Sequence, residues 1–430
     1  MHVYFSGIGG SGISALALIA KQSGYEVSGS DARPSRYLDY LRQKGIGNTS
    51  VGITDDFITK VHASKPIDWY VFGSAQPMDF PNHPEFEFCK QNGIKMTKRD
   101  ELLNQIITEK KLKLIAIAGT HGKTTTTAMA VWLFKQLGIP ISYSVGGKIS
   151  FGDIGHYQPD SQYFIYEADE FDRNFLAFHP YHSLITGIDW DHPDIFPTRQ
   201  DYNEAFKQFI DQSEHAVLWK NDIDRLAIKP TDHQMVLDDT DSNIAKFKLA
   251  GLVNRQNAWQ VVKGLGVLVD KPIEDIIRMM NDFPGLSRRF EQIVPGLYSD
   301  YAHTPGKIRG ALQMAGEAGG KNVVVVYEGL HNLRQHFIKE DLRMLFDDVK
   351  RLYIVPSYLA REDKTLKTLS PADLLDMLSI ESKKHSQTAV LDNNLKQSIQ
   401  KHLADGDLVV CLTAGGPDSL DEWLRHNFGS

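Results

Sequence analysis

A short glycine-rich loop places the strongest constraint on how this chain folds. It reads Gly119-x-x-Gly122-Lys123-Thr124 and lies between an apolar run, 114–118, and a helical pattern, 125–137. At such a strand-to-helix junction, backbone N–H groups and the helix dipole attract an anion. The glycines let the backbone approach phosphate, the lysine supplies a positive charge, and the threonine offers a hydroxyl to Mg²⁺. We therefore expect this loop to bind the phosphates of ATP.

The composition predicts a soluble protein of several domains. The chain has 430 residues, of which 42% are hydrophobic and 23% charged, and single cores rarely grow much beyond ~250 residues. We expect a cytoplasmic protein, because no apolar run is long enough for a membrane span and no signal peptide is evident. The two cysteines, Cys89 and Cys411, show no metal-like spacing. A net charge of −7 argues against nucleic acid or an acidic membrane as a partner.

The N-terminal residues predict a βαβ unit that binds a nucleotide. An apolar run at 2–6 leads into Gly7-Ile8-Gly9-Gly10-Ser11-Gly12, a helical pattern covers 13–23, and a second strand at 26–29 ends at Ser30-Asp31. The glycine spacing and the later acidic residue are those of a dinucleotide-binding fold. Taken alone, this pattern also allows an NAD(P)-dependent oxidoreductase. We expect a Rossmann-like domain over residues 1–105.

The middle of the chain places acidic groups after two further predicted strands. The run 163–166 leads into Glu167-Ala168-Asp169-Glu170, and the run 184–188 leads into Asp189-Trp190-Asp191-His192. In a parallel sheet the carboxyl ends of strands line the binding crevice. These groups should therefore converge on the phosphate loop in a P-loop ATPase-like domain over 106–285. A solvated strand end or helix cap for Glu167, and a structural role for His192, remain alternatives.

The last third predicts another open α/β sheet. Pro284-Gly285 forms a turn before a hinge, and strand patterns follow at 323–327, 352–355 and 408–412, with a helix over 307–318. The four valines at 323–326 are typical of a parallel strand covered on both faces. The fold class is therefore α/β with three domains, the last a Rossmann-like domain over 286–430.

Together these motifs resemble the Mur ligase family over essentially the whole chain. Six segments fit family motifs in family order. They are Gly119–Thr126, Glu167–Asp172, Asp191–Asp194, Asn254–Ala258, Arg288–Glu291 and Asp300–Pro305.

The resemblance implies an ATP-dependent ligase that forms an amide bond in cell-wall precursor synthesis. The γ-phosphoryl group of ATP would pass to the carboxylate of UDP-N-acetylmuramate, and an incoming amine would displace phosphate from the resulting acyl phosphate. This step brings ATP against another anion. Neutralisation of charge by Mg²⁺ and by cationic side chains should therefore dominate catalysis.

The resemblance also implies a role for each motif. The expected ATP-binding residues are Gly119, Thr120, His121, Gly122, Lys123, Thr124, Thr125, Asn254, Asn257 and Arg289. The expected Mg²⁺ ligands are Thr124, Glu167 and His192. The expected UDP-substrate residues are Gly7, Gly9, Gly10, Ser11, Gly12, Asp31 and Ser74, and the expected amino-acid-binding residues are Asp300, Tyr301 and His303. The expected catalytic residues are Lys123, Glu167, His192 and His303, with His303 as a base for the ammonium group or as a packing residue.

Within the family, the sequence is most similar to the branch that adds L-alanine to UDP-N-acetylmuramate. The loop at 7–14 and the segment Arg99–Leu103 resemble that branch, and Phe206 occupies the place where later branches carry a carboxylated lysine. The branch that recycles the murein tripeptide is the alternative, since Asp194-Ile195-Phe196 resembles its version. The protein would act as a monomer or homodimer.

Two departures bear on the activity. Val253 stands where a histidine usually precedes the adenine-site asparagine, and Leu330-His331-Asn332 replaces a Pro-His-Arg segment. The missing arginine removes a contact to carboxylate or phosphate, and Arg334 could replace it only if the loop is rebuilt. These departures motivate one more alternative, a relative that binds nucleotide without catalysis.

Overall fold

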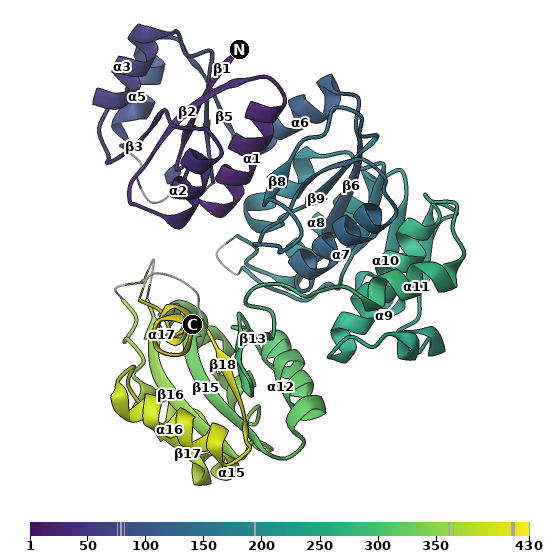
Figure 1. Ribbon diagram of the computed structural model, residues 1–430, viewed down its shortest axis with the longest axis vertical. Coiled ribbons are helices and arrows are strands. Elements are labelled where there is room, and N and C mark those ends of the chain that lie inside the picture. Colours follow the sequence, from purple (N-terminus) through teal and green to yellow (C-terminus); the bar gives the residue numbers. More distant parts are fainter. Residues whose placement is uncertain are drawn as a thin grey trace. The chain divides into compact units, whose positions relative to one another are not determined.

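The chain is a mixed α/β structure built on three sheets, as the computed structural model shows (Figure 1). The structure describes residues 1–74, 76–77, 80, 82–192, 195–359, 362–363, 365–413 and 418–429. It divides into two compact units, Met1–Phe247 with Asn257–Phe283, and Lys248–Gln256 with Pro284–Ser430. The first unit contains both sheets of the first two predicted domains, so the three-domain division stays a prediction. None of the helices in the described part of the chain has the length and apolar character needed to span a bilayer.

The first sheet is parallel, with strand order β3-β2-β1-β4-β5. Its strands are β1 (His2–Ser6), β2 (Glu26–Asp31), β3 (Thr49–Val51), β4 (Trp69–Phe72) and β5 (Lys95–Lys98). Its helices are α1 (Ser11–Gln22), α2 (Arg36–Gln43), α3 (Asp56–Ser64), α5 (Pro84–Gln91) and α6 (Arg99–Glu109). Ligands of such doubly wound sheets bind outside the carboxyl ends of the strands. The glycine loop after β1 and the last residue of β2, Asp31, both lie at that edge.

The second sheet has the order β12-β11-β10-β6-β9-β7-β8 and is parallel except for the β7–β8 pair. Its strands are β6 (Lys113–Ala118), β7 (Ile141–Ser144), β8 (Gly155–His156), β9 (Tyr163–Glu167), β10 (His182–Ile185), β11 (Ala216–Trp219) and β12 (Gln234–Leu237). Its helices are α7 (Lys123–Gln136), α8 (Arg199–Asp211), α9 (Lys220–Leu226), α10 (Leu252–Gly266) and α11 (Ile273–Asn281), with 3₁₀ helices η1 (Phe171–Ala177) and η2 (Ser242–Lys246). Because β9 and β10 flank β6, the phosphate loop and both acidic segments leave the sheet at one edge.

The third sheet has the order β13-β14-β18-β15-β16-β17, with only the β13–β14 pair antiparallel among its described pairs. Its strands are β13 (Glu291–Val294), β14 (Leu297–Asp300), β15 (Val323–Leu330), β16 (Arg351–Tyr358), β17 (Ser386–Thr388) and β18 (Leu408–Leu412). Its helices are α12 (Pro305–Gly319), α13 (Asn332–Leu342), α14 (Pro371–Met377), α15 (Ile380–Lys384), α16 (Asn393–Ala404) and α17 (Leu420–Phe428).

The four valines of β15 confirm the prediction of a doubly covered strand. Val323 and Val325 pack with α12 and α14, whereas Val324 and Val326 pack with α16 and α17. Figure 1 shows α12 and α16 on opposite sides of this sheet. Alternate side chains of a strand point to opposite faces, so an uninterrupted apolar run needs both coverings.

Most predicted elements are confirmed, and the errors lie at their ends. The strand predicted over 184–188 ends earlier, at Ile185, because Gly187 takes a left-handed φ of +128° that breaks the extended backbone. The helix predicted from Thr125 begins at Lys123, directly after Gly122 with φ +81°. Such glycine conformations are not visible as breaks in apolar periodicity.

A buried carboxylate, that of Glu85 on α5, ties the strands of the first sheet together. It is fully buried and accepts hydrogen bonds from Tyr4 (2.7 Å), Ser6 (2.9 Å), Ser30 (2.5 Å) and Tyr70 (2.9 Å). Buried charge is tolerated when hydrogen bonds replace water. Ser6 and Ser30 stand immediately before the glycine loop and Asp31, so this network holds the two strand ends that carry the predicted UDP-substrate residues.

We predict that Glu85→Gln lowers the free energy of unfolding by about 2 kcal/mol, because an amide NH₂ would then face hydroxyl donors. Urea unfolding measures the loss. Glu87→Gln is the matched control, since Glu87 is exposed on the same helix and its change should stay within about 0.5 kcal/mol. Equal effects of the two substitutions would contradict this role for Glu85.

Candidate active site

The phosphate loop has a backbone that only glycine adopts without strain. Gly119 has φ +140°, and a Cβ there would lie 2.4 Å from Thr186 Oγ1. Gly122 is the N-cap residue of α7 and has no side chain to cap the helix. A bound anion can therefore satisfy the first N–H groups of α7, as at other helix N-termini.

Thr120 fastens this loop to the segment after β10. Its hydroxyl donates to the carbonyl of Asp189 (2.6 Å), accepts from the Asp189 N–H (2.8 Å) and contacts the Tyr202 hydroxyl (2.8 Å). The side chain is buried. Thr120 thus shapes the loop through its hydroxyl, which leaves its backbone as the part suited to a phosphate.

A buried ion pair lies at the centre of the site. Lys123 Nζ is 2.6 Å from Glu170 Oε2 and donates to the Gly119 carbonyl at 2.6 Å. The Glu170 side chain is 1% exposed. Burial opposes its ionisation, but Lys123 and His192 outweigh burial and lower the pKa of Glu170 to about 2. Burial likewise opposes the charge of Lys123, yet Glu170 raises its pKa above the ordinary value.

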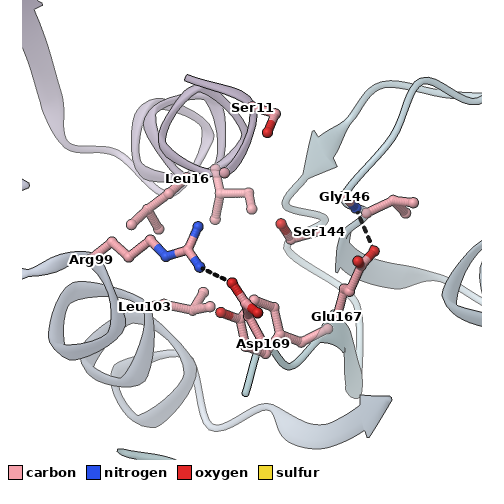
Figure 2. Close-up of a pocket in the computed structure, with 12 residues that line it drawn as sticks. Ser11, Leu16, Arg99, Leu103, Ser144, Gly146, Glu167 and Asp169 are labelled. Atoms are coloured by element: carbon pink, nitrogen blue, oxygen red, sulfur yellow. Dashed lines mark hydrogen bonds and ion pairs between the residues drawn. The ribbon is translucent and has the colours of Figure 1, made fainter. Parts of the chain in front are cut away.

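Two hard oxygen groups lie beside this pair. The Thr124 hydroxyl donates to Glu167 Oε1 (2.9 Å), and the Gly146 N–H donates to Glu167 Oε2 (2.8 Å; Figure 2). His192 Nε2 lies 3.6 Å from Glu170 Oε1, and the His192 ring packs edge-on against Phe171. Asp194 of the same motif lies outside the described residues.

These groups suit Mg²⁺ only together with a phosphate. Among the described residues, no three His, Cys, Asp or Glu side chains are grouped as a metal site. Mg²⁺, however, commonly takes one or two protein oxygens and completes its shell with phosphate and water. The adjacent hydroxyl of Thr124 and carboxylate of Glu167 fit that pattern, whereas imidazole is an unusual ligand for so hard a cation. The assignment of His192 as a ligand stays a prediction.

A cavity of about 190 Å³ lies next to Glu167, within the first unit. It is lined by one face of α1, by α6, and by the ends of β7 and β9 with the residues that follow them (Figure 2). The Arg99 guanidinium in this cavity is 3.3 Å from Asp169. Residues of the predicted UDP loop and the predicted metal ligand Glu167 thus line the same cavity.

The predicted UDP-substrate residues are held by short polar contacts. Asp31 accepts from the Gly9 N–H at 2.8 Å, and the Ser35 hydroxyl donates to the Gly9 carbonyl at 3.0 Å. Ser11 and Gly12 line the cavity. Ser74 is buried and its hydroxyl donates to Asn174 Oδ1 at 3.0 Å, so it connects β4 to η1.

The two predicted adenine-site asparagines belong to different units, although both are on α10. Asn257 is buried in the first unit beside the phosphate loop, since a Cβ on Gly122 would lie 3.1 Å from its Oδ1. Asn254 belongs to the second unit and donates to the Ala250 carbonyl at 2.8 Å. Their roles toward adenine stay predictions.

The predicted amino-acid-binding residues form one cluster in the second unit. Asp300 accepts from the Phe290 N–H at 2.7 Å, and burial raises its pKa to about 6 despite the charge of Arg289. His303 Nδ1 contacts the Tyr301 carbonyl at 2.9 Å and Nε2 contacts Lys307 Nζ at 3.3 Å. Burial, together with nearby cations, lowers the pKa of His303 well below its ordinary value, so its ring is neutral near pH 7.

Three residues of this site had no role predicted from their motifs. Glu170 binds Lys123, Asp169 lines the cavity, and Arg99 projects into it. Glu170 and Asp169 were visible as carboxylates in the acidic motif. Their different partners were not, because neighbouring residues after a strand point in different directions.

Comparisons with known proteins address the family directly. Residues 2–111 match the Mur ligase family, catalytic domain, and residues 117–256 match the Mur ligase middle domain. The chain belongs to the Mur ligase family. It is 30% identical to UDP-N-acetylmuramate–L-alanine ligase of Lachnospira eligens, with 96% of each chain covered. It is 28% identical to the enzyme of that name from Rickettsia bellii, covering 100% of this chain and 96% of the relative.

Two solved structures share this Mur ligase fold over nearly the whole chain. UDP-N-acetylmuramate-alanine ligase from Thermotoga maritima has a TM-score of 0.77 at 22% identity, covering 99% of this chain and 98% of the other. A murein peptide ligase from Psychrobacter arcticus has a TM-score of 0.65 at 20% identity, covering 97% and 96%. The predicted α/β class is confirmed, and the oxidoreductase alternative does not fit a Mur ligase.

We predict that Lys123→Met lowers the free energy of unfolding by about 3 kcal/mol, because it leaves the buried Glu170 without its nearest cation. Lys123→Met with Glu170→Gln should recover most of that loss. Urea unfolding at pH 7 measures both, and equal losses would contradict the coupling.

The Lys123–Glu170 pair also determines how the free energy of unfolding depends on pH. The folded pKa of Glu170 is about 2, against an ordinary value of 4.5. Its stabilising contribution is therefore complete above pH 4.5 and is lost as the pH falls through 2. Glu170→Gln should remove this pH-dependent part of the free energy of unfolding.

Proposed function

We propose that this Mur ligase joins L-alanine to the carboxylate of UDP-N-acetylmuramate and releases ADP and phosphate. The observation that carries the proposal is 30% identity over 96% of both chains to a relative named for this reaction. The first unit supports it, because a nucleotide loop, carboxylates and a cavity beside the UDP-type glycine loop lie together. As a Mur ligase, the chain is an ATP-dependent ligase.

The first chemical step is transfer of a phosphoryl group. A carboxylate oxygen of the substrate attacks the γ-phosphorus of ATP, the bond to the bridging oxygen breaks, and ADP leaves. Lys123, the first residue of α7, would stabilise negative charge on the transferred phosphoryl group. Thr124 and Glu167 would hold Mg²⁺, which supplies further neutralisation of charge on the phosphate oxygens.

Glu170 prepares Lys123 for the reaction before the nucleotide binds. The ion pair keeps the ammonium group of Lys123 charged in a buried place where burial alone would favour the neutral amine. When phosphate oxygens arrive, they compete with Glu170 for the same cation. Lys123 therefore enters the reaction already protonated and already directed at the phosphate loop, where it contacts the Gly119 carbonyl.

The second step is attack by the amine on the acyl phosphate. The amine nitrogen bonds to the carbonyl carbon, its proton is removed, and phosphate leaves. A neutral His303 suits the role of base, since a protonated imidazole could not accept that proton. Its contact with Lys307 Nζ at 3.3 Å would have to open first.

The second unit also offers a cation for the carboxylate of the amino acid. Asn332 stands where the branch that adds L-alanine has arginine. Its Nδ2 donates to the Lys367 carbonyl (3.1 Å), and its Oδ1 accepts from the Leu369 N–H (2.8 Å). It thus braces a loop. Arg334, on the first turn of α13, acts on His303 electrostatically and lowers its pKa. We assign carboxylate binding to Arg334, because guanidinium groups bind carboxylates through paired hydrogen bonds.

The function is tested by ADP release with UDP-N-acetylmuramate, ATP and either L-alanine or the murein tripeptide. We expect turnover with L-alanine, loss of turnover when EDTA removes Mg²⁺, and no turnover by Lys123→Ala. Turnover with the tripeptide but not with L-alanine would mean that the protein catalyses the recycling reaction instead. Nucleotide binding without ADP release in any mixture would mean a non-catalytic relative.

We predict that Arg334→Gln raises the KM for L-alanine roughly ten- to hundred-fold, as expected for a lost charged hydrogen bond. The KM for ATP should not change. Lys339→Gln, farther along the same helix, is the matched control and should leave both constants unchanged. An unaltered KM for L-alanine in Arg334→Gln would refute the assignment.

A further inference from the structure

Arg99 begins α6 and projects into the cavity between the glycine loop and Glu167 (Figure 2). Its Nη2 lies 3.3 Å from Asp169 Oδ2, and its Nε lies 3.6 Å from Asp100 Oδ1. Its side chain is 22% exposed. The guanidinium is therefore held by carboxylates and still reachable from the cavity.

The charges of the cavity single out this residue. Among the described residues that line it, Arg99 is the one cation, and Glu167 and Asp169 are carboxylates. Of the charged side chains in this lining, both acids repel an entering anion and Arg99 attracts it. Gly12 makes room for this group, because a Cβ at that position would lie 1.9 Å from Arg99 Nη1.

We propose that Arg99 binds the carboxylate that is to be phosphorylated, and that this carboxylate takes the place of Asp169 on the guanidinium. The inference rests on the proposed function, since it needs a nucleotide-sugar substrate that carries a carboxylate. Guanidinium and carboxylate match in planar, paired hydrogen bonds. A carboxylate held there would lie in the cavity that Gly12 of the UDP loop and Glu167 both line.

The diphosphate of the substrate has a different set of donors. The glycine loop leads into α1, whose first residue is Ser11 and whose N-cap residue, Gly10, has no side-chain cap. Backbone N–H groups at such a helix start suit a diphosphate. The Arg99 guanidinium lies beside Gly12 and contacts Asp169. We therefore assign it to the second anionic group of the substrate, the carboxylate.

The neighbouring Lys98 provides a matched comparison. It makes an ion pair with Asp172, so it also connects the first sheet to the segment after β9. Lys98 does not appear among the residues that line the cavity. A purely structural role for Arg99 would make the two residues equivalent, whereas substrate binding sets Arg99 apart.

The test measures binding of two ligands by calorimetry, without ATP and without metal. UDP-N-acetylmuramate carries the carboxylate, and UDP-N-acetylglucosamine carries only the diphosphate. Arg99→Gln should bind the first ligand roughly ten- to hundred-fold more weakly and the second unchanged. Arg99→Lys should recover part of the loss, and Lys98→Met should bind both ligands as wild type does.

Asp169→Asn gives a readout that a structural role would not produce. Removing the competing carboxylate should tighten the binding of UDP-N-acetylmuramate and leave UDP-N-acetylglucosamine unchanged. Equal weakening of both ligands by Arg99→Gln would reassign Arg99 to the diphosphate or to folding, and unchanged binding would also overturn the proposal. A wild-type protein that binds neither ligand would overturn the proposed function itself.

Discussion

The buried contact between Lys123 and Glu170 is the interaction on which the site depends. It joins the first residue of α7 to the segment that follows β9. An unpaired charge at either position would be costly, because little water reaches them. The pair therefore holds the phosphate loop against the acidic segment before any ligand binds, and it leaves a cation that phosphate can compete for.

Around this pair, other polar groups of the site are also paired within the protein. Thr124 donates to Glu167, a carboxylate suited to Mg²⁺, and Arg99 pairs with Asp169, in the place proposed for the substrate carboxylate. In the two ion pairs, Glu170 on Lys123 and Asp169 on Arg99 thus occupy positions where anionic ligands would bind. Such contacts give the cationic and anionic groups partners in the ligand-free protein. Exchanging one partner for another costs less free energy than leaving a buried group without a partner. The site is organised by charge before it is filled.

Much of the fold could be predicted from sequence, because apolar periodicity reports burial directly. The strand β18 was predicted with the bounds that it has, and the valines of β15 indicated two covered faces. Helix and strand ends were less predictable, as at Gly187, since a left-handed φ leaves no trace in the apolar pattern. The network around Glu85 was also missed. Its donors come from β1, β2 and β4, and they meet only after those strands have paired.

The sequence by itself determined the chemistry of the parts: a phosphate loop, acidic strand ends and a second glycine loop, each recognisable because its spacing follows from local backbone geometry. Only the tertiary structure decided which of these parts contact one another. It placed Glu170 rather than Glu167 on Lys123, used the hydroxyl of Thr120 for the loop itself, and directed Arg99 toward Asp169. These pairings depend on strand order and on the direction of each side chain. Such contacts are made across the sheet rather than along the chain.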